Sequence, residues 1–326
     1  MLAGKSSAKA MIGEATGLGK PVIVIGGTTA SGKSALALAI AEAFDGTIVN
    51  ADSMQVYSQL RILTARPDDD ALARARHRLF GILEAGNPCS AGRWRDMAMA
   101  EIEAAHGQGR LPIVVGGTGL YLKALIEGID EIPPISPAVR EAARARHAEI
   151  GGEVFHAELA ARDPDSGNRL PASDTQRLIR AMEVLEETGR TLGEWQNSAA
   201  AEPPSGLRFL TFHLVPPREV LYPACDARFT AMIQGGAMDE VRALLSLGLD
   251  PELPLMKAVG VRELGQALAG EISQADAVIA GQQATRRYAK RQYTWFRHHI
   301  ADAEIFLAQY SERLSPQIFN KIRAFC

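Results

Sequence analysis

Hydrophobic residues in the first part of this chain follow two alternating patterns. Short runs of apolar or β-branched residues occur at 22–25, 47–50 and 111–115, and each run ends at a glycine-rich or polar turn. The intervening segments 35–40 and 91–106 look helical instead. Strands that alternate with helices are typical of a parallel sheet covered by helices. The pattern therefore predicts an α/β fold with a parallel sheet flanked by helices.

The alternation stops after residue 129, where a proline-containing linker begins. Three helices with no strand between them are expected next, from Ser136 to Gly151, from about Glu153 to Arg162 and from Ser173 to Gly189. A β-prone run then follows at 208–215, with helical patterns at 238–247 and 261–268. We expect this run to rejoin the sheet, so that the three helices form an inserted helical lobe.

These boundaries divide the chain into three parts. The α/β core with its C-terminal helices is expected at 21–130 and 205–326, the inserted lobe at 131–204, and a flexible extension at 1–20. The extension is rich in Ala, Gly, Ser and Lys and has no apolar segment, which disfavours a secretory signal.

Composition disfavours several classes of protein. Hydrophobic residues make up 47% of the chain, but no apolar run approaches the ~20 residues of a membrane-spanning helix. Cys89, Cys225 and Cys326 lack disulfide or metal spacing, and there is no His-x-x-x-His pair. We therefore expect a cytoplasmic protein with no membrane contact and no protein-bound zinc. The net charge of −3 disfavours a wholly basic nucleic-acid binder and leaves room for a local basic patch.

The most specific chemical signal is the segment Gly-Thr-Thr-Ala-Ser-Gly-Lys-Ser, between the first expected strand and the first expected helix. This is the phosphate-binding P-loop pattern in its strand–loop–helix context. Backbone N–H groups and the helix N-terminus can face one anion, Lys33 adds a positive charge, and the Ser34 hydroxyl suits Mg2+ carried by the phosphates. The segment predicts binding of a di- or triphosphate by Gly27, Thr28, Thr29, Ala30, Ser31, Gly32, Lys33 and Ser34.

Two more turns follow expected strands. Asp52 comes soon after the run 47–50, and Gly116-Gly117-Thr118 closes the run 111–115. Ligands bind at the carboxyl ends of parallel strands, so Asp52 should lie near the P-loop. A helix N-cap explains an aspartate at this position equally well. Thr118 can offer its hydroxyl to a ligand, and the alternative is a tight turn into the next helix.

The third helix of the expected lobe has two different faces. Residues 173–176 fit a capping box, and an apolar stripe begins at Leu178. Gln176, Arg177 and Arg180 lie on the other side, within a turn of each other. Two arginines and an amide on one exposed face suit phosphate and base contacts. The alternatives are a capping role for Gln176 and a solvated helix face for the arginines.

A basic segment at 285–299 interleaves Arg and Lys with aromatic residues, and no carboxylate lies between Asp276 and Asp302. Such a mixture suits phosphate contacts beside base stacking, and it also fits an amphipathic helix that buries its aromatics. We expect both, with aromatic residues mostly inward and cations outward. Arg228, in a helix after the run 208–215, is either a phosphate ligand or a surface charge.

Taken in order, these motifs resemble the tRNA dimethylallyltransferase family in its bacterial form, over nearly everything after Lys20. The resemblance is carried by Gly27 to Ser34, Asp52-Ser53-Met54-Gln55, Thr64-Ala65-Arg66-Pro67, Gly116-Gly117-Thr118-Gly119-Leu120-Tyr121, Gln176-Arg177 to Arg180, Arg228-Phe229, and Lys290-Arg291-Gln292 with Trp295-Phe296. It implies a P-loop NTPase-like sheet and transfer of a dimethylallyl group from dimethylallyl diphosphate to the N6 amine of the adenine 3′ to a tRNA anticodon.

The resemblance also directs the choice of site residues. Asp52 is the expected base for the weakly nucleophilic amine, with Thr29 beside the diphosphate or the amine. Lys33, Arg228 and Mg2+ at Ser34 would stabilise the leaving diphosphate. We expect a monomer that binds tRNA through Asp52, Ser53, Met54, Gln55, Thr118, Arg140, Gln176, Arg177, Leu178, Ile179, Arg180, Lys290 and Arg291.

Five positions depart from the family pattern. Leu63 stands where Gly is usual, Gly81 replaces a usual Asp, and Cys89 occupies a position where an aromatic residue is common. Ala224 and Val261 stand where Arg and Tyr are frequent. These departures affect local contacts, particularly a second arginine on the diphosphate.

Other functions share part of this pattern. A small-molecule kinase has the same loop and metal and predicts consumption of ATP without an isoprenoid. Prenyl transfer to free adenine nucleotides needs neither the helical insert nor the basic segment. A non-catalytic RNA-binding protein would not need Lys33, Ser34 and Asp52 together.

Overall fold

A six-stranded sheet with strand order β3-β2-β4-β1-β5-β6 forms the centre of the fold. The computed structural model describes residues 19–129, 132–198, 203–300 and 302–326. The strands are β1 (Lys20–Gly27), β2 (Gly46–Asn50), β3 (Arg76–Arg78), β4 (Leu111–Val115), β5 (Leu207–Leu214) and β6 (Glu304–Phe306). All neighbouring strands run parallel, which confirms the predicted α/β class.

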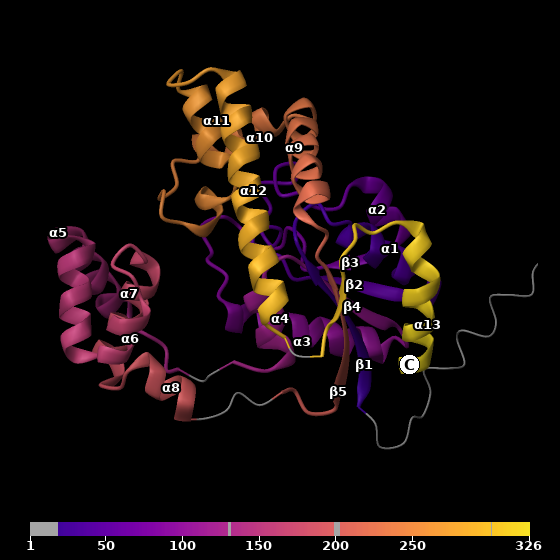
Figure 1. Cartoon of the computed structure of the whole chain (residues 1–326), viewed down its shortest axis with the longest axis horizontal. Helices are drawn as coiled ribbons and strands as arrows, with labels where there is room; N and C mark the ends of the chain where they lie inside the picture. The colour runs from indigo at the N-terminus through magenta and orange to yellow at the C-terminus, as the bar shows by residue number, and fades with distance from the viewer. Residues whose placement is uncertain (1–18, 130–131, 199–202, 301) are drawn as a thin grey trace, which may run out of the picture. The chain divides into compact units, whose positions relative to one another are not determined.

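The two faces of the sheet are buried in separate apolar clusters. In β1, Val22 and Val24 belong to one cluster, whereas Ile23 and Ile25 belong to the other. Successive side chains of a strand point to opposite faces, so a strand covered on both sides must be apolar throughout. The Ile23 face is covered by α1 (Lys33–Phe44) and α13 (Ser315–Phe325), and the Val22 face by α3 (Ala91–Gly107), α4 (Gly119–Ile126) and α12 (Gln274–His298) (Figure 1).

The helices after β5 form a group beside the sheet (Figure 1). They are α9 (Arg218–Gln234), α10 (Ala237–Ser246), α11 (Val261–Leu268) and α12, with the 3-10 turn η2 (Pro254–Lys257) before α11. The basic segment 285–299 lies mainly on α12, where Phe296 is buried and Lys290, Arg291 and Arg297 are exposed. This is the expected amphipathic arrangement. None of the described helices combines the length and apolar character that a membrane crossing requires.

Both edges of the sheet escaped the sequence analysis. β3 reads Arg-His-Arg, so it has no apolar signal, and β6 has only 3 residues. Two short helical elements, α2 (Asp69–Arg74) and the turn η3 (Glu312–Leu314), also lie near these edges in sequence. The expected extension at 1–20 falls outside the described residues except at its end, where Lys20 already begins β1.

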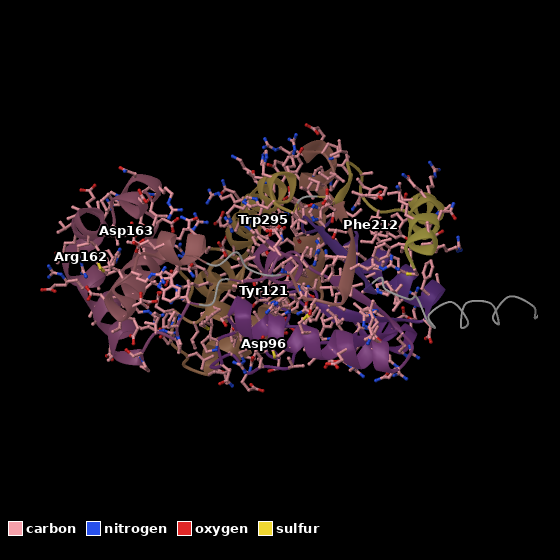
Figure 2. All side chains as sticks on the ribbon, turned by 90° about the horizontal axis from the view of Figure 1, so that it is seen from below. Asp96, Tyr121, Arg162, Asp163, Phe212 and Trp295 are labelled. Atoms are coloured by element: carbon pink, nitrogen blue, oxygen red, sulfur yellow. The ribbon has the colours of Figure 1, made fainter. Side chains whose placement is uncertain are left out.

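Residues Glu127–Pro203 form a second compact unit, separate from the sheet and the helices that cover it. Its helices are α5 (Pro137–Arg162), α6 (Pro164–Arg169), α7 (Thr175–Thr188) and α8 (Leu192–Ser198). α5 contains a break at Gly151, where φ is 77°, which matches the expected end of one helix and start of the next. At the end of α5, the buried Asp163 accepts a hydrogen bond from the Ser166 N–H and so caps α6 (Figure 2).

Helix α7 begins one residue later than the capping box predicts. Asp174 Oδ1, and not Ser173, accepts the hydrogen bond that closes the helix start, from the N–H of Arg177. Gln176 is therefore one position too early for the reciprocal contact of a capping box, and its side chain is exposed.

Candidate active site

The P-loop connects β1 to α1 along a backbone path that needs glycine. At Gly27, with φ 141°, an added Cβ would lie 2.2 Å from the carbonyl oxygen of Leu214. Gly32, with φ 89°, precedes α1, and Ala30 between them has φ 58°. Glycine adopts such angles at no steric cost. Loops of this kind turn successive N–H groups toward one concavity, which is an anion-binding arrangement.

Hydrogen bonds inside the loop hold this shape. The Ser31 hydroxyl donates to the carbonyl of Thr28 at 2.7 Å, and Lys33 Nζ donates to the same carbonyl at 2.5 Å. Thr28 and Ser31 are fully buried. Ser31 and Lys33 both line the cavity beside the loop, and their bonds to the Thr28 carbonyl stabilise the shape of the loop there.

A C-terminal segment around Tyr310, to which the sequence analysis assigned no role, is hydrogen-bonded to the P-loop. The Tyr310 N–H donates to the carbonyl of Ser31, and Gln309 Nε2 donates to the carbonyl of Ala30, both at 2.9 Å. A Cβ at Gly32 would lie 2.8 Å from the Tyr310 Cβ. No local signal reveals this contact, because it joins residues that are 279 positions apart in the sequence.

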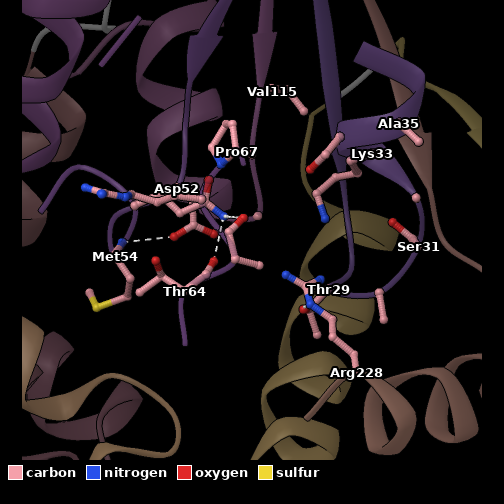
Figure 3. Close-up of a pocket in the computed structure, with 18 of the residues that line it drawn as sticks. Thr29, Ser31, Lys33, Ala35, Asp52, Met54, Thr64, Pro67, Val115 and Arg228 are labelled. Carbon is pink, nitrogen blue, oxygen red and sulfur yellow. Dashed lines mark hydrogen bonds between the residues drawn. The ribbon is translucent and has the colours of Figure 1, made fainter. Parts of the chain in front are cut away.

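Two cations, Lys33 and Arg228, line the cavity on the side of the P-loop (Figure 3). Burial, together with the positive charge of Arg228, lowers the pKa of Lys33 to about 7. Burial also lowers the pKa of Arg228, while the carboxylate of Asp52 opposes the shift at both cations. Arg228 Nη1 donates to the Thr29 hydroxyl at 3.3 Å. Arg228 therefore joins the P-loop, and the surface-charge interpretation is wrong.

The carboxylate of Asp52 lies on the opposite wall of the cavity (Figure 3). Its Oδ1 accepts the N–H of Met54 and its own N–H donates to Asn50 Oδ1, both at 2.9 Å. Asn50 is fully buried, and its carbonyl accepts the Trp94 indole N–H at 2.7 Å. No helix begins after Asp52, so the N-cap interpretation is wrong. The residue sits in a tight turn held by the end of β2.

The turn after β4 supports the same wall. The Thr118 hydroxyl accepts the Ser53 N–H at 2.8 Å and donates to the Ser53 hydroxyl at 3.1 Å. At Gly116 an added Cβ would lie 2.0 Å from the carbonyl oxygen of Ala51. Thr118 is thus hydrogen-bonded to the turn that carries Asp52, and it helps to hold that turn in position.

Gln292 bridges the wall formed by the P-loop and the wall that carries Asp52. Its Oε1 accepts the Thr29 N–H at 2.7 Å, and its Nε2 donates to the carbonyl of Gly117 at 2.9 Å. Only 5% of the residue is exposed. The sequence showed Gln292 as part of a motif but assigned it no role. Glutamine is suited to this bridge because its amide offers one acceptor and one donor group.

These walls enclose a cavity of about 750 Å³. In Figure 3, Thr29, Lys33 and Arg228 lie on one side, and Asp52, Met54 and Thr64 on the other. Apolar side chains form part of its lining: Leu63, Phe80, Phe229, Met232 and Val259. The cavity thus combines a cationic loop, a carboxylate and an apolar surface, which suits a diphosphate ester with a hydrocarbon chain.

Three departures from the family pattern have a structural account. Leu63 is buried, and its Cδ1 would lie 2.9 Å from a Cβ at Gly260, so that glycine makes room for it. At Gly81 a Cβ would lie 1.8 Å from Arg66 Nη1, so Arg66 occupies the space of a side chain there. Ala224 lines the cavity, where it offers no charge to a diphosphate.

The other expected tRNA contacts lie in two units. Ser53, Gln55 and Arg291 line the cavity, and Lys290 is exposed on α12. In the unit Glu127–Pro203, Arg140, Gln176 and Arg177 are exposed and Ile179 and Arg180 are partly exposed. Leu178 is fully buried among Phe155, Leu159 and Met182. The expectation of a direct Leu178 contact is therefore wrong, because the side chain fills the core of this unit.

Comparison with known proteins finds relatives along most of the chain. A family model described as IPP transferase matches residues 55–299. The tRNA dimethylallyltransferase of Rhodospirillum centenum is 58% identical over 287 residues, which cover 88% of this chain and 91% of that protein.

Two solved structures share the fold. The tRNA isopentenylpyrophosphate transferase of Bacillus halodurans matches with a TM-score of 0.67 and 28% identity, over 93% of this chain and 96% of that one. A eukaryotic dimethylallyltransferase acting on tRNA matches with a TM-score of 0.76 and 25% identity, over 93% of this chain and 78% of that one.

Proposed function

This chain belongs to the IPP transferase family, and from that membership we propose how it acts as a tRNA dimethylallyltransferase. The donor is dimethylallyl diphosphate, and the acceptor is the N6 amine of the adenine 3′-adjacent to the anticodon of a tRNA. The observation that carries the proposal is the placement of one carboxylate, Asp52, across a partly apolar cavity from the cations of a P-loop.

The donor half of the reaction uses the P-loop wall. The bond between the allylic carbon and the diphosphate oxygen breaks, and its electron pair leaves with the diphosphate. Lys33, Arg228 and the loop N–H groups stabilise the negative charge that develops on that oxygen. The apolar lining around Phe229 and Met232 accommodates the hydrocarbon chain.

The acceptor half uses the opposite wall. The adenine amine is a weak nucleophile because its lone pair is delocalised into the ring. As nitrogen forms a bond to the allylic carbon, Asp52 accepts one of its protons, which contributes about 100-fold or more to the rate. The Met54 N–H donates to this carboxylate, and the Asp52 N–H donates to Asn50 Oδ1, so that both the side chain and the backbone of Asp52 are held in place. Thr29 contacts the diphosphate beside Arg228.

A magnesium ion fits the oxygen donors at the P-loop. Ser34 lies in the first turn of α1 and lines the cavity, and its hydroxyl is a hard oxygen ligand of the kind that Mg2+ prefers. Among the described residues no group of three or more His, Cys, Asp or Glu side chains is arranged for a metal. Ser34 and the diphosphate would therefore hold the ion, which supplies charge neutralisation when bound.

Binding of the tRNA requires the target base to leave its stack, at a cost of a few kcal/mol. We assign contacts with the base and its neighbours to Asp52, Ser53, Met54 and Gln55. Lys290 and Arg291 on α12 and Arg140, Gln176, Arg177, Ile179 and Arg180 in the helical unit supply contacts with the anticodon arm. Exposed cations at these places support the assignment.

The experiment that tests the proposal is incubation of the protein with unmodified tRNA, dimethylallyl diphosphate and Mg2+, followed by mass analysis of the nucleosides. We expect one adenosine per substrate tRNA to gain a dimethylallyl group. A control with ATP in place of the isoprenoid should leave the tRNA unchanged. Unmodified tRNA together with rapid ATP consumption would replace the proposal with the kinase alternative. Prenylation of free AMP at the same rate would point to the nucleotide as acceptor.

A further inference from the structure

Glu240, on α10, binds three consecutive backbone N–H groups of a distant loop. Its Oε1 accepts the N–H of Arg61 at 2.8 Å and of Ile62 at 2.8 Å, and its Oε2 accepts the N–H of Ile62 at 2.9 Å and of Leu63 at 3.0 Å. These N–H groups lie in a segment that is neither helix nor strand. Without Glu240 they would need other partners, because buried N–H groups left unpaired are costly.

The same loop is packed onto the start of α10 as well as bonded to it. The Ile62 Cγ2 would lie 3.7 Å from a Cβ at Gly235, and its Cδ1 would lie 3.6 Å from one at Gly236. Gly236, with φ 103°, is the residue that precedes α10. The carboxylate and the apolar contact therefore act together, and the loop has little freedom to shift relative to α10.

From this anchor the chain runs directly into the wall of the cavity. Leu63, Thr64, Ala65, Arg66 and Pro67 all line it. The loop is also tied to the turn that carries the Asp52 carboxylate. Gln55 Nε2 donates to the carbonyl of Thr64 at 2.8 Å, and Arg66 Nη1 donates to the carbonyl of Tyr57 at 2.9 Å. Displacement of the loop would therefore reach the wall where the acceptor binds.

We propose that Glu240 is a positioning residue for the acceptor wall of the site: it holds the loop 61–67 so that Thr64, Arg66 and, through Gln55, the Asp52 turn face the adenine. This inference rests on the proposed function. It assigns Glu240 no contact with substrate. The described hydrogen bonds that hold the P-loop wall do not involve Glu240: they come from Gln292 and from the segment around Tyr310. Loss of Glu240 should consequently affect turnover of tRNA without affecting diphosphate binding.

The test is the substitution Glu240→Gln, with Asp239→Asn as the matched control. Gln keeps the size of the side chain but replaces one accepting oxygen with an NH2 group that cannot accept an N–H. Asp239 is the neighbouring acid on the same helix, with a side chain that is 79% exposed and paired only with Arg242 among the interactions described for it. Measured quantities are kcat and KM with tRNA, the Kd of inorganic diphosphate, and hydrogen exchange of the backbone at 61–67.

We expect kcat of Glu240→Gln to fall about 10- to 100-fold, the range in which a small misplacement of reacting groups acts. Diphosphate affinity should be unchanged, exchange at 61–63 should accelerate, and Asp239→Asn should match the wild type. Unchanged kcat despite faster hydrogen exchange at 61–63 would overturn the inference, because the hydrogen bonds to Glu240 would then stabilise the loop without affecting catalysis. A parallel loss of diphosphate affinity would overturn it too.

A variant that keeps the charge covers the case in which Glu240→Gln fails to fold. Glu240→Asp retains a carboxylate that is one methylene shorter, so it should show the same kcat-specific loss at a smaller size. Loss of diphosphate affinity in this variant, or an unchanged kcat, would contradict the role. Wild-type protein that leaves tRNA unmodified would show instead that the proposed function has failed, and the inference would fall with it.

Discussion

The backbone N–H of Thr29 donates a 2.7 Å hydrogen bond to Oε1 of the buried Gln292, 263 positions away along the chain. The other end of the same amide donates to the carbonyl of Gly117. One side chain of α12 therefore spans the turn that follows β1 and the turn that follows β4. These are the two neighbouring strands at the centre of the sheet, and the bridge sets the distance between the parts of the site that they carry.

Replacement of Gln292 by Leu should destabilise the protein. Leu has a similar size but leaves the Thr29 N–H and the Gly117 carbonyl without a partner, which costs about 1–3 kcal/mol of unfolding free energy for a buried group. Urea unfolding measures this loss. Gln234→Leu, at the exposed end of α9, is the control and should stay close to the wild type. Equal stability of both variants would show that the bridge contributes nothing.

Asp52→Asn should lower kcat by about 100-fold or more, because the amide cannot accept the proton of the attacking amine. Asn still accepts the Met54 N–H through its Oδ1, so the turn should survive and tRNA affinity should change little. Single-turnover kinetics with saturating tRNA separate the two effects. Asp45→Asn, which removes only a surface pair with Arg110, is the control. Turnover of Asp52→Asn near the wild-type value would remove this residue from the role of base.

Diphosphate binding should be coupled to protonation of Lys33. In the free protein burial lowers the pKa of this amine to about 7, so at pH 8 the neutral form dominates and at pH 5.5 the charged form does. A bound diphosphate favours the charged form and raises the pKa again. Binding at pH 8 should therefore take up close to one proton at Lys33, and binding at pH 5.5 should take up almost none.

Calorimetry in buffers of different ionisation enthalpy measures this uptake. Lys33→Arg is the matched variant, since a guanidinium stays charged at both pH values. Protons exchanged by the diphosphate itself occur in both proteins, and their contribution cancels in the difference. The wild type should exceed Lys33→Arg at pH 8 and equal it at pH 5.5. A difference that is the same at both pH values would contradict the lowered pKa.

Arg177→Gln and Arg180→Gln together should weaken tRNA binding and flatten its salt dependence by about 1 to 2 in the slope of log K against log salt. The pair of Arg177 with Asp174, at 3.6 Å, is a largely exposed contact of small energetic value. Glu183, which pairs with Arg180 at 3.5 Å, has a side chain that is only 8% exposed, so loss of this pair should cost some stability. Circular dichroism checks that the lobe remains folded. Arg242→Gln, on α10, is the control. An unchanged slope would identify both arginines as a solvated helix face.

Local pattern alone was enough to predict the frame of the molecule. The apolar runs that became β1, β2 and β4 are buried on both faces, and hydrophobic burial imposes that signature on the sequence directly. The P-loop was equally visible, because the angles at Gly27 and Gly32 demand glycine at fixed spacing. β3 and β6 were missed for the complementary reason: at the edges of a sheet, backbone pairing alone can hold 3 residues of any polarity.

The sequence by itself determined where the P-loop motif lies, and it predicted the residues to which we assign the chemistry: Lys33 and Ser34 by their motif, and Asp52 by its position soon after a strand. It left Asp52 and Arg228 each with two interpretations, and it assigned no role to Gln292, Tyr310 or Glu240. Only the tertiary structure decided these points. Each of Arg228, Gln292, Tyr310 and Glu240 makes a hydrogen bond to a segment distant in sequence, and no helix begins at Asp52. Periodicity and spacing report what a residue does to its near neighbours, whereas the shape of this site is set by contacts that exist only once the chain has folded.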